Sequence, residues 1–265
     1  MNYKNKIVWI TGASSGIGEA FAKAFFKEGA KLILSSRRKD TLIEVQNYLG
    51  ADNSNCYILP LDLSDPDSLA NKAEEALAAF GRIDVLVNNG GISQRSLFAE
   101  SDMSTIRRLM EVNFFGSAEL TRAVLPSMME QKSGHIIVTS SVAGKFGTKF
   151  RSGYAASKHA LQGLFDCIRQ EMYEYNVAVT IVCPGPIKTN ITQNSLTADG
   201  SDFGKMGDLH KTAMDADEMV SRIWGKIKNQ KEEIYISSPK ERLAQLVKRI
   251  SPRLLNIILK NSKVT

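Results

Sequence analysis

The chain of 265 residues is poor in the features that mark several protein classes. It has only three cysteines, Cys56, Cys167 and Cys183, and seven prolines. Because the cysteines lack short paired spacings, we expect no disulfide scaffold and no zinc site, and their apolar surroundings predict buried thiols in a reducing compartment. No run of about 18 apolar residues is present, so no membrane-spanning helix is expected. The start of the chain lacks the apolar core of a signal peptide, which favours a cytoplasmic protein.

An excess of either charge is also missing from most of the chain. The formal net charge is +6, from 34 Lys and Arg residues against 28 Asp and Glu residues. Residues 240–265 hold seven of these cations and one of the anions, which leaves 27 of each in residues 1–239. A balanced body argues against a nucleic-acid partner, whose phosphates attract a basic surface.

The basic tail, residues 240–265, also carries an apolar pattern of helical period. Its apolar residues from Leu243 to Ile250 share one face, and a second apolar group follows Ser251 and Pro252. A basic amphipathic hairpin of this kind is typical of peripheral membrane contact, or of the mouth of a site for lipid substrates. The alternative is a tail that packs on its own domain or on a partner subunit.

The chain is rich in alternation between two kinds of segment. Short apolar or β-branched runs are separated by longer segments of helical period, which predicts parallel strands joined by helices. We therefore predict one α/β domain over residues 1–239, with a doubly wound, seven-stranded parallel sheet and helices on both faces. The expected strands are Lys6–Thr11, Lys31–Ser35, Cys56–Leu61, Ile83–Asn88, Gly134–Ser140, Val177–Cys183 and Glu233–Ser237.

One segment, at about residues 189–214, breaks the alternation. It is polar and rich in glycine, and a loop of this length in a compact domain is usually functional, so we predict a lid over a substrate site. A set of apolar side chains either lines a pocket beneath the lid or belongs to ordinary packing. These residues are Phe146, Phe150, Leu196, Phe203 and Met206.

A glycine-rich turn follows the first expected strand. Gly12, Gly16 and Gly18 form the pattern Gly-x-x-x-Gly-x-Gly at the start of a helical segment. Glycine permits a sharp turn and a close approach of the backbone to a pyrophosphate, while the helix N-terminus supplies free N–H donors. The turn predicts a dinucleotide site, with a plain strand-to-helix turn as the alternative.

The choice of dinucleotide depends on the end of the second strand. An enzyme that prefers NAD would place an acidic residue there to bind the ribose hydroxyls, but this chain has Arg37 and Arg38. Two guanidinium groups match a 2′-phosphate in charge and geometry, so we predict NADP(H) rather than NAD(H). Otherwise both arginines are solvated or paired with Asp40 or Glu44.

Acid-base chemistry is indicated by Tyr154 and Lys158, which lie four residues apart on one face of an expected helix. A neighbouring cation lowers the pKa of a phenol and makes it a better acid-base group. Ser141 follows the fifth strand at the edge where such sheets bind ligands. Asn113 lies within a helical segment although an amide is a poor helix former. The Tyr-x-x-x-Lys spacing is commonplace alone, and its context carries the prediction.

These motifs, in this order, resemble those of the short-chain dehydrogenase/reductase family over residues 6–237. The resemblance implies a single-domain Rossmann fold in which Tyr154 is the general acid or base, and Lys158 lowers its pKa and holds the nicotinamide ribose. It implies that Ser141 binds the substrate oxygen and that Asn113 keeps a water in a proton relay. The implied cofactor site consists of Thr11, Gly12, Ser14, Ser15, Gly16, Ile17, Gly18, Arg37, Arg38, Asp62, Leu63, Asn88, Asn89, Gly90, Tyr154, Lys158, Pro184, Gly185, Ile187 and Thr189.

One glycine of the motifs and the three histidines call for separate predictions. Gly90 departs from the family pattern, which usually has Ala there. No metal is expected, because the histidines lack ligand spacing and are interpreted as surface or edge residues. The histidines are His135, His159 and His210.

Within the family, the chain resembles the branch that contains 11-beta-hydroxysteroid dehydrogenase and dehydrogenase/reductase family member 7B. This resemblance implies a ketone or secondary alcohol on an apolar, lipid- or steroid-like substrate. Keto esters and sugar carbonyls are alternative substrates, and a sensor or scaffold that binds NADP(H) without turnover is an alternative function. The family also implies a homodimer or homotetramer formed through the helices around Asn113 and Lys158.

Overall fold

The computed structural model describes residues 1–204 and 213–260. Its main sheet has seven parallel strands in the order β3-β2-β1-β4-β5-β6-β9, which confirms the predicted doubly wound fold. The strands are β1 (Ile7–Thr11), β2 (Lys31–Ser35), β3 (Cys56–Ile58), β4 (Val85–Asn88), β5 (Gly134–Thr139), β6 (Val177–Pro184) and β9 (Glu233–Ile236).

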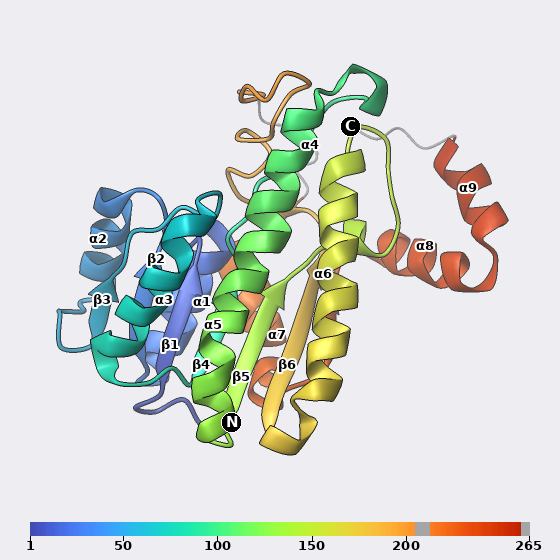
Figure 1. The fold of residues 1–265 in the computed structure, drawn as a ribbon. Coiled ribbons are helices and arrows are strands. Elements are labelled where there is room, and N and C mark those ends of the chain that lie inside the picture. Colours follow the sequence, from blue (N-terminus) through green and yellow to red (C-terminus); the bar gives the residue numbers. More distant parts are fainter. Residues whose placement is uncertain (205–212, 261–265) are drawn as a thin grey trace.

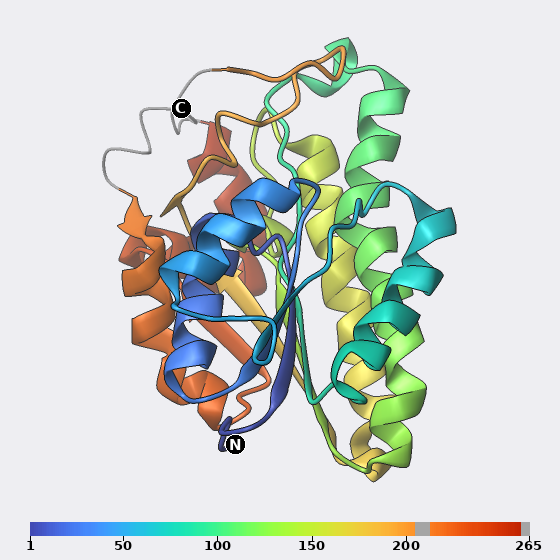
Figure 2. The same cartoon turned by 90° about the vertical axis from the view of Figure 1, so that its left-hand side faces the viewer.

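The helices form one layer on each face of the sheet (Figures 1 and 2). The first layer has α1 (Gly16–Lys27), α2 (Lys39–Tyr48) and α7 (Ala216–Lys228). The second layer has α3 (Pro66–Phe80), α5 (Gly116–Glu130) and α6 (Ser152–Glu171). A further helix, α4 (Met103–Met110), continues into α5 through a π-helical turn at Glu111–Phe115.

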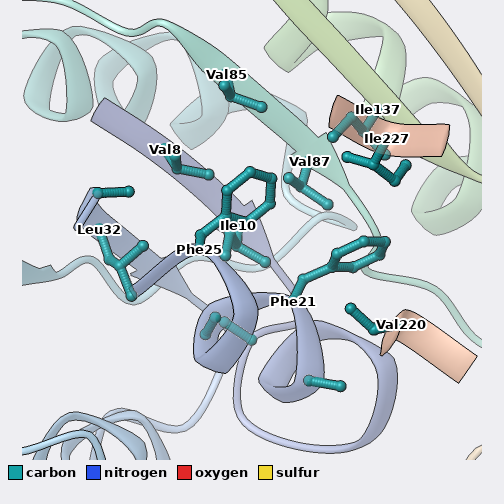
Figure 3. Packing of buried hydrophobic residues seen from close by; sticks show 14 of the residues in the cluster. Val8, Ile10, Phe21, Phe25, Leu32, Val85, Val87, Ile137, Val220 and Ile227 are labelled. Atoms are coloured by element: carbon teal, nitrogen blue, oxygen red, sulfur yellow. The ribbon is translucent and has the colours of Figure 1, made fainter. Parts of the chain in front are cut away.

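Side chains alternate between the two faces of each buried strand, so every strand contributes to both layers of the core. Val8 and Ile10 of β1 pack with Phe21 and Phe25 of α1 (Figure 3). Trp9, between them, packs in the cluster on the opposite face. Because both faces are covered, the sheet is a fixed frame, and the carboxyl ends of its strands hold the loops that follow them.

Two short strands were not predicted. β7 (Ile187–Lys188) and β8 (Met214–Asp215) pair in parallel and join the two ends of the predicted lid. Strands of two residues are too short to give a periodic pattern. Met206 of the lid lies outside the described residues.

The tail, in its described part, forms two helices that lead away from the sheet, α8 (Pro239–Ile250) and α9 (Pro252–Lys260) (Figure 1). Leu255 is buried, but most of the apolar side chains are exposed: Leu243, Leu246, Ile250, Leu254, Ile257 and Ile258. Nowhere in residues 1–204 or 213–260 is a helix both long and apolar enough to cross a bilayer.

Two interpretations of single side chains were wrong. Cys167 is exposed, whereas Cys56 and Cys183 are buried as expected. His135 is fully buried within β5, where its ring lies 2.8 Å from the hydroxyl of Thr180 on the neighbouring strand. Burial disfavours the charged ring and lowers the pKa of His135 to about 3.

The prediction for the other two histidines is not contradicted. His159 is exposed on α6, as expected, and His210 lies outside the described residues.

Candidate active site

A cavity of about 700 Å³ opens at the carboxyl ends of the central strands. β1 pairs with β2 on one side and β4 on the other, which makes this the switch point where open α/β sheets bind ligands. Most of the predicted site residues line this cavity: Gly12, Ser14, Ser15, Gly16, Ile17, Arg37, Arg38, Asp62, Leu63, Asn89, Gly90, Ser141, Tyr154, Lys158, Pro184, Gly185, Ile187 and Thr189.

Three predicted cofactor residues do not line the cavity but shape its wall. The hydroxyl of Thr11 accepts a hydrogen bond of 3.0 Å from the backbone amide of Gly90. A Cβ on Gly18 would lie 2.1 Å from the carbonyl oxygen of Gly12, so α1 packs directly against the turn. Asn88 donates a hydrogen bond of 2.8 Å to a buried hydroxyl of α5. These contacts hold the turn after β1 beside the loop after β4.

The turn after β1 has the shape that a dinucleotide requires. Gly12 and Gly16 have φ values of +63° and +58°, which side chains disfavour. A Cβ on Gly16 would lie 2.7 Å from the side chain of Thr189. Within the described chain, Ser15 makes no side-chain cap of α1, so the first N–H groups of this helix are free for an anion. The residues present therefore fit a bound pyrophosphate.

Arg37 and Arg38 border the same cavity beyond the end of β2, and both are exposed. In the part of the chain that the structure describes, neither forms an ion pair with Asp40, Glu44 or another carboxylate. Two cations beside the first turn of α2 oppose the helix dipole. This end of the cavity is therefore suited to a bound anion.

Tyr154 and Lys158 lie on one face of α6 and are 8% and 4% exposed. The Nζ atom of Lys158 is 5.8 Å from the ring centre of Tyr154, and it donates a hydrogen bond of 2.8 Å to the carbonyl of Thr139. Ser141 lies beyond the end of β5, where its hydroxyl accepts a hydrogen bond of 3.1 Å from the amide of Ala143. The three polar side chains thus meet in one largely buried place.

Burial dominates the ionisation of both side chains. It raises the pKa of Tyr154, and a hydrogen bond with Ser141 and the positive charge of Arg151 offset part of that rise. Burial lowers the pKa of Lys158 to about 8. The protonated form of Lys158 therefore carries a free-energy penalty from burial, which an anionic neighbour would reduce.

Asn113 does not line the cavity but ties its elements together from the π-helical turn. Its side-chain oxygen accepts a hydrogen bond of 2.8 Å from the amide of Ile92. Its side-chain nitrogen donates one of 2.9 Å to the hydroxyl of Ser157, which donates to the carbonyl of Tyr154. Asn113 therefore connects the loop after β4 to the helix that carries Tyr154 and Lys158. The water relay remains a prediction.

Sequence reasoning missed several residues of this site. Gln94 is fully buried, and its side-chain oxygen accepts hydrogen bonds of 2.7 and 3.4 Å from the amides of Gly153 and Tyr154. This side chain caps α6 from a distant loop. Arg95 and Arg151 line the cavity beside Tyr154. A lone Gln gives no signal, and the only hint for Arg151 is its place three residues before Tyr154.

The tail also reaches the cavity, which the sequence did not indicate. Glu241 of α8 belongs to its wall, and a Cβ on Gly185 would lie 2.6 Å from the Glu241 carboxylate. Lys248, about two helical turns further along α8, donates a hydrogen bond to the carbonyl of Lys145, in the segment after Ser141. The start of the tail is thus attached to the part of the chain that holds the cavity.

The described part of the predicted lid lies over the end of the sheet, toward α4 (Figure 2). The amide of Leu196 donates a hydrogen bond of 2.8 Å to the carbonyl of Ser93. Leu196 and Phe146 line the cavity. Phe150 is 37% exposed and, like Phe203, is not on the described cavity wall, so only part of the predicted apolar set faces it.

The amino-acid sequence was compared with family models and with known proteins. A family model described as short chain dehydrogenase matches residues 6–200. Dehydrogenase/reductase SDR family member 7B of Mus musculus is 39% identical over 255 residues, which are 95% of this chain and 79% of the relative. Dehydrogenase/reductase SDR family protein 7-like of Anopheles gambiae is 41% identical over 260 residues, 96% and 82% of the two chains.

Solved structures share the fold. A short chain dehydrogenase/reductase from Burkholderia phymatum, in complex with NAD, superposes with a TM-score of 0.83 at 24% identity over 96% of both chains. A short chain dehydrogenase from Burkholderia cenocepacia, in complex with NADP, gives a TM-score of 0.80 at 23% identity over 99% of this chain and 100% of the other. At such identities the likeness concerns the fold alone.

Proposed function

The chain belongs to the short-chain dehydrogenase family, and on this premise we propose that it is an NADP(H)-dependent oxidoreductase that interconverts a ketone and a secondary alcohol. The observation that carries the proposal is the meeting of Tyr154, Lys158 and Ser141 in the cavity that the glycine-rich turn borders. A buried tyrosine, lysine and serine suit proton transfer to one substrate oxygen.

The roles of Tyr154, Ser141 and Lys158 follow from the O–H or N–H groups that each side chain can donate. The dinucleotide, when bound, supplies or accepts the hydride. Tyr154 donates its O–H proton to the substrate carbonyl oxygen during reduction and takes the hydroxyl proton in the reverse direction. Ser141 donates a hydrogen bond to the same oxygen and stabilises the charge that develops there. The ammonium of Lys158 stabilises the phenolate of Tyr154 and so lowers its pKa.

Preference for NADP(H) is supported by the free guanidinium groups of Arg37 and Arg38. A 2′-phosphate next to the ribose would give these cations the anionic partner that the described part of the chain does not supply. NAD(H) offers no such group.

An apolar substrate is supported by Phe146 and Leu196 on the cavity wall. Keto esters and sugar carbonyls are the competing substrates. A sensor or scaffold without turnover is disfavoured, because binding alone does not need a buried lysine beside a buried tyrosine.

The experiment that tests this proposal compares the wild type with Tyr154→Phe, using NADPH oxidation over steroid, lipid, keto-ester and sugar carbonyls. We expect the variant to lose at least about 100-fold in turnover while NADPH affinity changes little. Wild-type protein that binds NADPH but reduces none of these carbonyls would support the sensor instead.

We also propose that the chain forms a homodimer or homotetramer through the helices around Asn113 and Lys158. Phe115, the last residue of the π-helical turn before α5, is 47% exposed although its ring packs against Phe114. The free thiols of Cys56 and Cys183 suit a reducing compartment such as the cytoplasm.

Peripheral membrane contact through residues 240–265 is a further proposal. Its support is the exposed apolar surface of α8 and α9 together with the seven cations of the tail. Because Glu241 borders the cavity, such contact would bring the active site to the lipid surface.

A further inference from the structure

Two arginines lie beside the catalytic tyrosine on the substrate side of the cavity. The guanidinium carbon of Arg151 is 5.8 Å from the ring centre of Tyr154, and its Nη1 donates a hydrogen bond of 2.9 Å to the hydroxyl of Ser93. Arg95 is two residues beyond Ser93, and its guanidinium carbon is 5.1 Å from the ring centre of Phe203. Both arginines line the same cavity as Tyr154.

These two positive charges are not neutralised by an ion pair with any residue that the structure describes. Within residues 1–204 and 213–260, neither Arg95 nor Arg151 forms an ion pair. Among the described residues, three carboxylates border the cavity as a whole. Asp62 accepts hydrogen bonds from Ser64, and Glu241 caps α8, while Asp202 is exposed on the lid.

The surroundings of Arg151 make its charge costly without a ligand. The side chain is half-buried, and burial lowers the pKa of Arg151. Tyr154 offsets part of this fall, and the charge of Arg95 adds to it. Arg151 also lies at the N-terminus of α6, a helix of 20 residues whose dipole is positive at that end. Burial of Arg151, the charge of Arg95 and the helix dipole each favour an anion in the cavity next to Tyr154.

We propose that the substrate carries an anionic group, a carboxylate or a phosphate, a few bonds from its carbonyl, and that Arg95 and Arg151 bind it. The inference rests on the proposed reductase function and narrows its substrate class. The apolar part of the substrate contacts Phe146 and Leu196, so the substrate is an acidic amphiphile rather than a neutral steroid or lipid. Guanidinium groups suit this task because they form paired hydrogen bonds with either anion.

The test uses pairs of ketones, one with the anionic group and one without it, with NADPH oxidation as the readout. The carboxylate arm compares β-ketooctanoate with its methyl ester, and the phosphate arm compares acetol phosphate with acetol. For the wild type we expect kcat/KM to favour the anion by about tenfold or more in at least one arm, mainly through KM. The arm with the larger preference identifies the anion.

The variants are Arg95→Gln and Arg151→Gln, with Arg107→Gln as the control. Arg107 is exposed on α4 and lies off the described cavity wall, so it reports the loss of one charge elsewhere. In both test variants the preference for the anion should fall toward unity, whereas the control keeps it. If Arg151 only adjusts the pKa of Tyr154, its variant shifts the pH profile with neutral ketones and leaves the preference unchanged.

A binding measurement keeps the inference testable when turnover is poor. Calorimetry with NADPH-loaded protein compares β-hydroxyoctanoate with its methyl ester in the wild type and in Arg95→Gln. Tighter binding of the acid in the wild type alone supports the inference. A wild type without preference for the anion in turnover or binding overturns it, while the reductase function survives if Tyr154→Phe abolishes reduction of the neutral ketones.

Discussion

The side-chain amide of Asn113 donates a hydrogen bond of 2.9 Å to the hydroxyl of Ser157, directly before Lys158. The same side chain exchanges two further hydrogen bonds with the backbone of Ile92. We expect Asn113→Ala to lower the free energy of unfolding by about 2 to 3 kcal/mol, since it leaves buried partners unsatisfied. Turnover should fall at least about tenfold because the catalytic helix loses its alignment.

The matched variant for this prediction is Ser157→Ala, which removes one of the three hydrogen bonds of Asn113 and also the bond from the Ser157 hydroxyl to the carbonyl of Tyr154. Denaturant unfolding should give a loss of about 1 kcal/mol, and steady-state kinetics a smaller loss of turnover. Equal losses in the two variants would show that the bonds to Ile92 contribute no more than the bond between Ser157 and Tyr154.

Burial of Lys158 predicts an unusual dependence of stability on pH. Burial lowers the pKa of Lys158 from 10.5 to about 8 in the folded chain. Between these two values the unfolded chain keeps a proton that the folded chain has lost, so the contribution of Lys158 to stability rises with pH there. Below pH 8 the folded chain bears the full cost of a buried ammonium.

Lys158→Met removes this cost. We expect the variant to be more stable at pH 7 by up to about 3 kcal/mol, at about 1.4 kcal/mol for each pKa unit, and to lose the rise in stability above pH 8. Its turnover should be lost. Urea unfolding across this pH range measures the effect, with Lys226→Met, an exposed lysine on α7, as the control. Parallel profiles for the wild type and Lys158→Met would contradict the prediction.

The fold was predictable because buried parallel strands leave a strong local signal. Ile7 to Thr11 is apolar enough to be read as a strand without knowledge of its neighbours, and all five residues are buried. The polar residue His135 could not be interpreted in this way. Its partner Thr180 lies 45 residues away and becomes a neighbour only when β5 pairs with β6.

The residues of the candidate site likewise fall into those that a local pattern predicts and those that it does not. Tyr154 and Lys158 could be predicted because a helix brings residues four apart together, which spacing alone reveals. Gln94 and Arg95 reach the start of the same helix from a loop nearly 60 residues earlier. Such approaches depend on the path of the loop, and no periodic pattern encodes that path.

Gly90 and Gly18 offer a matched test of how closely the turns approach each other. A Cβ on Gly90 would lie 2.5 Å from the Cδ1 atom of Leu63, a flexible side-chain end that can rotate away. A Cβ on Gly18 would lie 2.1 Å from the carbonyl oxygen of Gly12, which is fixed backbone.

We therefore expect Gly90→Ala to change the free energy of unfolding by less than about 1 kcal/mol, with little change in NADPH affinity. Gly18→Ala should cost about 3 kcal/mol or more and weaken NADPH binding strongly. Thermal unfolding and NADPH fluorescence titration measure both effects. A severe effect at Gly90 would mean that Leu63 cannot move.

The guanidinium groups of Arg37 and Arg38, beyond β2, predict how mutation will change the KM for each of the two cofactors. Arg37→Ala and Arg38→Ala should each raise KM for NADPH about tenfold or more, because a charged hydrogen bond to the 2′-phosphate is lost. KM for NADH should change little. Lys39→Ala is the control, since Lys39 is an exposed cation that is not on the described cavity wall. An equal rise for both cofactors would indicate general damage to the site.

The tail predicts binding to anionic lipid vesicles. Truncation after Pro239 is an unsuitable test, because Glu241 belongs to the cavity wall. The double variant Ile250→Ser/Ile257→Ser instead removes two exposed apolar side chains, which are 77% and 52% exposed, and keeps every cation. Membrane binding needs both apolar insertion and charge, so the wild type should cosediment with phosphatidylglycerol vesicles and be released by salt, while the variant binds weakly.

Tyr173→Ser is the control for the loss of exposed apolar surface, since Tyr173 is 83% exposed in the turn after α6. This variant should bind vesicles as the wild type does. Equal cosedimentation of the wild type and the double variant would refute lipid contact. A fall in the mass measured by light scattering for the double variant alone would assign the apolar face to a second copy of the chain, because removing side chains from a subunit contact separates the subunits.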